Sequence, residues 1–123
     1  MSRPSSLTVL QGSTWSQGWN VSLENSAWDE WPLGPIPDTW SVRCQVRAEI
    51  DSTEVLAEWD STDPETLPCG VADGVVTLSV PASVSSAWTW LRGRWDIEVV
   101  SPSGDIVLRV DWGTIVVRPE VTR

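Results

Sequence analysis

Apolar and polar residues alternate strictly along residues 40–50, and this pattern restricts the fold more than any other feature of the chain. The apolar members of the alternation are Val42, Cys44, Val46, Ala48 and Ile50, and the polar members are Arg43, Gln45, Arg47 and Glu49. Because successive side chains of a β-strand point to opposite sides, a period of two predicts a strand with one buried face and one solvated face. After a turn at 51–53, residues 54–59 return with Val55, Ala57 and Trp59 on the inward parity, which predicts a hairpin.

The C-terminal third predicts a β-meander. Strand-like segments cover residues 94–100, 105–110 and 113–118, with a turn at 101–104. Further strands are expected at 7–10, 19–23 and 75–80, and one short helical turn within 82–91. Seven or eight short strands in 123 residues predict a single all-β domain spanning 1–123, a two-layer antiparallel β-sandwich of immunoglobulin-like or jelly-roll-like type.

Residues 24–39 interrupt this regular pattern. Pro32, Pro35 and Pro37 fall within a short stretch, and each removes a backbone hydrogen-bond donor. Such a composition favours extended, unpaired chain. We therefore expect an irregular loop or a contact arm over 24–39.

Charge excludes several classes of partner. The formal net charge is -9, from 17 acidic and 8 basic residues, and every basic residue is Arg. An acidic chain without a basic cluster is not expected to bind nucleic acid or an anionic membrane surface. No apolar run approaches the ~20 residues of a transmembrane helix. Residues 1–6 lack the apolar core of a secretion signal, so we expect synthesis and first folding in a cytoplasm.

The residues needed for catalysis are scarce. There is no His, so a Ser or Cys nucleophile would lack its usual base, and no spacing defines a catalytic pair of carboxylates. Two Cys without His make a metal site improbable, so we expect no enzyme activity, no cofactor and no metal. Cys44 lies on an inward parity and is expected to be buried, while the sequence leaves a Cys44–Cys69 disulfide open.

Tryptophan is the unusual component, with ten Trp and neither Phe nor Tyr. Trp59 and Trp95 fall on inward parities, but ten indoles are more than a domain of this size easily hides. We therefore predict contacts with other chains, where Trp is enriched. The interface candidates are Trp15, Trp19, Trp28, Trp31, Pro35, Trp88, Trp90 and Arg92. The pairs Trp28/Trp31 and Trp88/Trp90 are alternatively a platform for sugar rings or plugs at the ends of the sandwich.

Several segments together resemble a family of small β-sandwich virion proteins from phages of actinobacteria, in which the domain belongs to minor tail or tail-fibre-associated proteins. The resemblance covers nearly the whole chain and is carried by residues 12–15, 41–47, 75–80, 94–99, 113–117 and 120–123. The chain departs from the family in having Trp95 where Tyr is usual, in its additional Trp residues and in the Pro-rich segment.

The resemblance implies a non-enzymatic structural subunit of a bacteriophage virion, acting through protein–protein contacts in the tail. It would be assembled in the host cytoplasm as a homo-oligomer and would bind other phage structural proteins. One alternative is a capsid decoration protein that cements the head. Another, from a different class, is a carbohydrate-binding module for a host-surface glycan.

Overall fold

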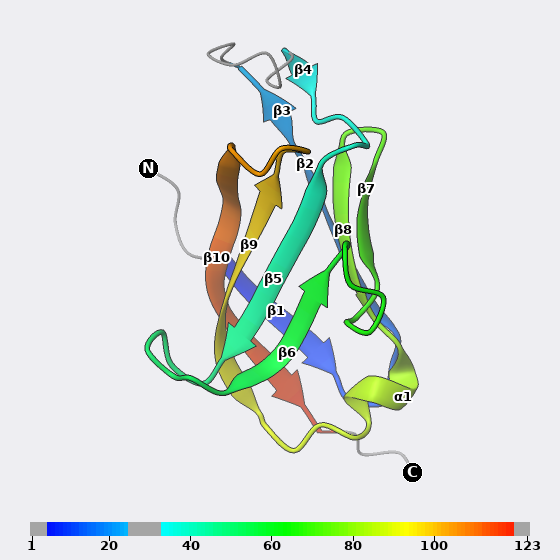
Figure 1. Cartoon of the computed structure of the whole chain (residues 1–123). Helices are drawn as coiled ribbons and strands as arrows, with labels where there is room; N and C mark the ends of the chain where they lie inside the picture. The colour runs from blue at the N-terminus through cyan, green and yellow to red at the C-terminus, as the bar shows by residue number, and fades with distance from the viewer. Residues whose placement is uncertain (1–4, 25–32, 120–123) are drawn as a thin grey trace.

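The computed structural model describes residues 5–24 and 33–119 and shows an all-β sandwich of two packed sheets (Figure 1). The larger sheet has five strands, and their spatial order is β1 (Ser5–Leu10), β10 (Val107–Arg118), β9 (Arg92–Val100), β5 (Ser41–Arg47) and β6 (Val55–Asp60). The second sheet has three strands, in the order β2 (Trp15–Asn20), β8 (Val75–Val80) and β7 (Cys69–Ala72). The predicted all-β sandwich is therefore confirmed.

The strand order is that of an immunoglobulin-like sandwich. The order β2-β8-β7 reproduces strands B, E and D of that fold, and β10-β9-β5-β6 reproduces strands G, F, C and C′. One pairing departs from the antiparallel prediction, because β1 runs parallel to β10, with Ser5 opposite Gly113 and Leu10 opposite Arg118. The first strand thus borders the last, and strands from the two ends of the described chain lie side by side in one sheet (Figure 1).

The core lies between the sheets and is filled by the inward parity of each strand. Val42, Cys44 and Val46 of β5 are buried as predicted, and so are Trp59 and Trp95. Burying one Val, Leu or Ile side chain contributes about 1.5–3 kcal/mol, so this alternation supplies the main driving force for folding. The indoles of Trp59 and Trp95 also satisfy their N–H groups: Trp59 Nε1 donates to Ser79 O and Trp95 Nε1 to Thr114 O, each at 2.9 Å.

The strand at 40–50 is shorter than its sequence pattern predicts. β5 ends at Arg47, and Ala48 and Ile50 are exposed rather than inward, with Ile50 83% exposed. The reason is local: Arg47 Nη1 donates to Ser52 O and Ser52 N donates to Glu49 O, which closes a turn before the alternation is complete. The register with β6 also shifts beside Arg47, and this shift leaves Val55 exposed.

Two further boundaries differ from the prediction. The strand expected at 19–23 begins earlier, at Trp15 of β2, whose register with β8 runs from Trp15 opposite Val80 to Asn20 opposite Val75. The segments expected at 105–110 and 113–118 form one strand, β10, interrupted by a bulge between Arg109 and Asp111. The short helical turn is confirmed as α1 (Ala82–Ser85).

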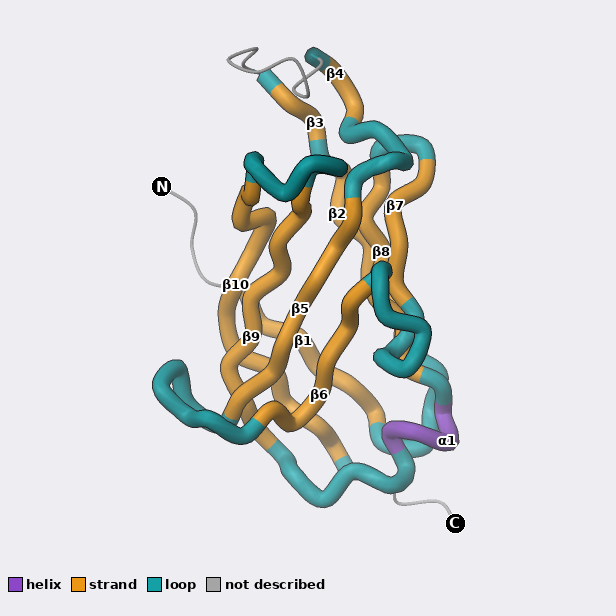
Figure 2. Tube along the Cα trace, viewed as in Figure 1, coloured by secondary structure: helices purple, strands orange, loops and turns teal. Residues whose placement is uncertain are grey.

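The described part of the Pro-rich segment packs onto the sandwich. β4 (Gly34–Pro35) pairs with β3 (Ser22–Leu23), and both extend beyond one end of the two sheets (Figure 1). Ile36 is 1% exposed, and its N–H donates to Val21 O at 2.9 Å. Most of the remaining loops lie at the two ends of the sandwich, and loops and strands can be compared in Figure 2. Residues 25–32, including Trp28 and Trp31, lie outside the described residues.

Candidate binding face

Arginine side chains gather on the outer face of the five-stranded sheet. They belong to the parity of β5, β9 and β10 that is opposite to the core, and we call this surface the arginine face. Its arginines are Arg43, Arg47, Arg92, Arg94, Arg109 and Arg118. Every arginine in the described parts of the chain is among them. The strand alternation that buries Val, Ile and Trp on one side therefore concentrates the cations on the other.

Two of these arginines form ion pairs on the face. Arg43 Nε lies 2.9 Å from Glu98 Oε1, and Arg109 Nη2 lies 3.6 Å from Asp96 Oδ2. Exposed pairs of this kind contribute about 0–1 kcal/mol, because water screens them and side-chain freedom is lost. These ion pairs fix where the charges lie on the face, and they contribute little to the stability of the fold.

Arg47 and Arg94 form a like-charge pair across strands. They lie directly opposite one another in the β5–β9 register. Arg47 donates from Nη2 to the neutral Gln45 Oε1 at 2.8 Å and from Nη1 to Ser52 O at 2.5 Å. Among the described residues, Arg94 has neither a hydrogen-bond nor an ion-pair partner for its guanidinium. Like charges at opposing positions destabilise a sheet by about 0.2–1 kcal/mol, so this pair costs stability that an incoming anion would restore.

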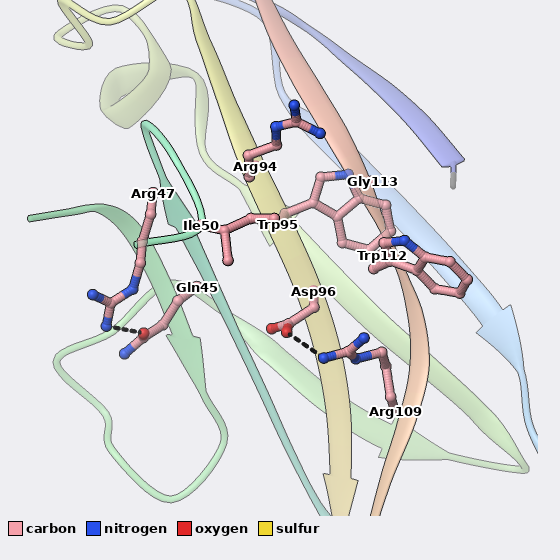
Figure 3. Close-up of a pocket in the computed structure, with 9 residues that line it drawn as sticks. All are labelled: Gln45, Arg47, Ile50, Arg94, Trp95, Asp96, Arg109, Trp112 and Gly113. Carbon is pink, nitrogen blue, oxygen red and sulfur yellow. Dashed lines mark hydrogen bonds and ion pairs between the residues drawn. The ribbon is translucent and has the colours of Figure 1, made fainter. Parts of the chain in front are cut away.

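An open cavity of about 320 Å³ lies over the like-charge pair. Its lining comprises Gln45, Arg47, Ile50, Arg94, Trp95, Asp96, Arg109, Trp112 and Gly113. Figure 3 shows Gln45 and Arg47 on one side of β9, and Arg109 and Trp112 on its other side. The lining residues thus include three arginines, two tryptophans and one carboxylate. That composition suits an anion with a flat or apolar attachment.

The bulge in β10 completes this cavity. Arg109 pairs with Glu98 and Asp111 pairs with Ile97, so Val110 is the additional residue. The inserted residue reverses the parity of the strand, so that Arg109 and Trp112 both face outward although an odd number of positions separates them. Sequence reasoning missed Trp112 for this reason, and it placed Arg47 only on the solvated face of its strand.

The predicted interface residues that the structure describes do not form one surface. Trp15, Trp19, Trp88 and Trp90 are each partly buried and pack against the core of their own chain. Pro35 lies in β4 beyond the end of the sandwich, and it is exposed. Arg92 is exposed on the arginine face but does not line the cavity. Trp28 and Trp31 fall outside the described residues. Of the candidates that the structure describes, it brings together only some.

The partly buried indoles form two pairs. Trp19 and Trp95 lie with ring centroids 5.8 Å apart and join strands β2 and β9, the B and F positions that a disulfide links in antibody domains. Trp88 and Trp90 lie 4.7 Å apart with their planes tilted by 36°. Trp90 Nε1 is buried without a partner among the described residues.

Both cysteines are free thiols. Burial raises the pKa of Cys44 well above its ordinary value, and nearby Asp96 and Cys69 raise it further. Partial burial, with a smaller effect of Asp60, raises the pKa of Cys69 to about 11. Both side chains therefore remain protonated at neutral pH, which makes them poor nucleophiles and poor metal ligands.

The described parts of the chain contain no group of three or more His, Cys, Asp or Glu that could hold a metal ion. Within the same residues, no helix is long and apolar enough to cross a membrane. Neither a protein-family model nor a curated protein matches the sequence.

Proposed function

We propose that this chain is a non-enzymatic structural subunit of a bacteriophage virion, a minor tail or tail-fibre-associated protein that works through protein–protein contacts. The virion assignment follows from the sequence resemblance. The observation that supports a contact role is the arginine face, where Arg47 and Arg94 lie opposite one another in the register without an ion-pair partner among the described residues, and Trp112 lines the same cavity. Trp and Arg are the residues that most often dominate the energy of protein interfaces.

The chemistry of the cavity favours binding over catalysis. Asp96 is its single carboxylate, and Asp96 already forms an ion pair with Arg109. An acid–base mechanism requires a second group whose pKa is adjusted to accept or donate the proton. The other lining groups are guanidiniums, an amide, apolar side chains and a glycine, and none of them serves as a base at neutral pH.

Mass spectrometry of purified particles, after separation of heads from tails, tests the proposal. We expect the chain in the tail fraction at a fixed copy number relative to the major tail protein. Recovery only in the head fraction would instead support the capsid decoration role. Absence of the chain from purified particles would overturn a structural role of either kind.

A carbohydrate-binding role is the second candidate, and a specific observation favours it. Trp88 lines a second open cavity, of about 530 Å³, together with Glu58, Glu65, Thr66, Leu67, Pro68, Pro81 and Val84. Partly exposed indoles stack on sugar rings, and carboxylates accept hydrogen bonds from hydroxyl groups. This role predicts glycan-array signals that Trp88→Ala abolishes and Trp112→Ala leaves unchanged, whereas an array without signal for the wild type removes it.

A further inference from the structure

Positive and negative charges are segregated on this chain. All described arginines lie on the arginine face, although the whole chain carries a net charge of -9. The described surfaces outside this face therefore present carboxylates without any cation. Outside its own arginine face, the described surface of a second copy carries carboxylates and no arginine, so it is complementary in charge to the arginine face.

The cavity on the arginine face fits a carboxylate group. The guanidinium fork donates two parallel hydrogen bonds to a carboxylate, a geometry that ammonium groups cannot reproduce. Arg94 has its full set of donors available, and Arg47 uses its donors only on neutral oxygens. A carboxylate bound to Arg94 would place a negative charge beside the register position of Arg47 and so reduce the repulsion between the two arginines, and Trp112 supplies apolar surface in the same cavity.

The β6–β7 loop, residues 61–68, presents such carboxylates on a fixed scaffold. Asp63 and Glu65 are both exposed. Thr66 N donates to Asp63 O at 3.2 Å, and Thr66 Oγ1 donates to Asp60 O at 3.0 Å and to Asp63 O at 2.8 Å. Glu65 N donates to Asp63 Oδ1 at 3.0 Å. Because the loop is already ordered by its own hydrogen bonds, little conformational entropy would be lost when it binds.

We propose that the arginine-face cavity receives a carboxylate of the β6–β7 loop from a second copy of the chain. This inference rests on the proposed contact role and names its partner. The loop begins at the end of β6 beside Arg43, whereas the cavity lies at the opposite end, beside Arg47. Two different patches of one chain thus form the contact, which makes it heterologous and allows a closed ring or an open row of copies.

The test measures self-association by light scattering and sedimentation at low ionic strength. We expect wild-type protein to associate as its concentration rises, and salt to reverse this association. Arg94→Glu should weaken it at least about tenfold, because a guanidinium that pairs with a carboxylate is replaced by a like charge. Glu65→Arg should weaken it to a similar extent from the other side of the contact.

Matched controls separate this contact from a general effect of charge. Arg118→Glu makes the same charge change on the same face but outside the cavity. Asp105→Arg makes the same change as Glu65→Arg in a different exposed loop. Both controls should associate like the wild type. Circular dichroism and thermal melting will show that each variant is folded.

Mixing the two disabling variants gives the sharpest outcome. Arg94→Glu keeps an intact loop and Glu65→Arg keeps an intact cavity, so an equimolar mixture restores one contact between the unchanged cavity and the unchanged loop. The exchanged charges also attract one another at the other contact. A mixture that forms dimers or larger assemblies, while each variant alone stays monomeric, supports the proposal. A mixture that remains monomeric contradicts it.

Three other results would overturn the proposal. The first is that wild-type protein stays monomeric at millimolar concentration. The second is that Arg94→Glu associates like the wild type. The third is that Asp105→Arg, rather than Glu65→Arg, loses self-association. If monomeric wild type binds a glucuronate-containing oligosaccharide and Arg94→Glu does not, the cavity is a saccharide site instead. Each of these outcomes is distinguishable from failure of the structural role, which the composition of the particle decides separately.

Discussion

Trp19 donates its indole N–H to Asp111 Oδ2 at 3.0 Å, which links strand β2 of one sheet to strand β10 of the other. The same carboxylate accepts hydrogen bonds from Ser5 Oγ at 2.9 and 2.8 Å and from Trp112 N at 2.9 Å. Asp111 therefore connects β1, β2 and β10 at one point. The connection lies beside the ring contact between Trp19 and Trp95 and holds the two sheets together without a disulfide.

Asp111→Ala should lower the free energy of unfolding by about 2–3 kcal/mol, because the Trp19 and Ser5 donors lose a charged acceptor in a partly buried site. Chemical denaturation in urea measures this. Asp105→Ala, at an exposed loop position, should stay within about 0.5 kcal/mol of the wild type. Equal stability of the two variants would show that the carboxylate does not connect the sheets.

Gly113→Ala should displace β1 from the larger sheet. A Cβ atom at Gly113 would overlap the carbonyl oxygen of Ser5 on the paired strand, and that backbone cannot yield without breaking the parallel pairing. We expect a loss of about 3 kcal/mol or more. Limited proteolysis should then cut the chain within β1. Gly70→Ala, where an added Cβ meets nothing within 4 Å, is the control and should resist cleavage like the wild type.

Ile36 and Ile50 should respond in opposite ways to the same substitution. Ile36 is 1% exposed, so Ile36→Ala should cost about 2–5 kcal/mol by leaving a cavity in the core. Ile50 is 83% exposed, so Ile50→Ala should change stability by less than about 0.5 kcal/mol. Thermal melting of the two variants distinguishes this arrangement from the sequence-based prediction, which placed Ile50 inward and 24–39 in an irregular loop.

Stability should fall at alkaline pH through the cysteine thiols. The pKa of Cys69 is raised from 9.0 to about 11 in the folded chain, mainly by burial. The unfolded chain therefore loses this proton first, so stability is complete below pH 9 and decreases as pH rises toward 11. Cys44 acts in the same direction.

Urea denaturation in a reducing buffer at pH 8 and at pH 10.5 measures this decrease. The first pH lies below the pKa of an ordinary thiol, about 8.5, and the second lies above it. Cys69→Ser should show a smaller decrease than the wild type, because it lacks one of the two groups. Alkylation of the folded protein by iodoacetamide should remain slow at pH 8. Rapid alkylation of the folded protein there would show that the thiols are not protected.

The sequence determined the features that depend on local periodicity. Burying one face of a strand forces a period of two, so the inward positions of Val42, Cys44 and Val46 were predictable, and so was the burial of Trp59 and Trp95. The helical turn after Pro81 and the all-β class follow from local composition in the same way.

Only the tertiary structure decided the features that join distant segments. The parallel pairing of Ser5 with Gly113 connects residues far apart in the chain, and the bulge beside Asp111 depends on the register with β9. The arginine-face cavity needs the bulge and the pairing of β5 with β9, because Arg47, Arg94 and Trp112 come from three strands and meet only when the register is fixed. Periodicity shows which face a side chain occupies, whereas pairing between strands decides which side chains become neighbours.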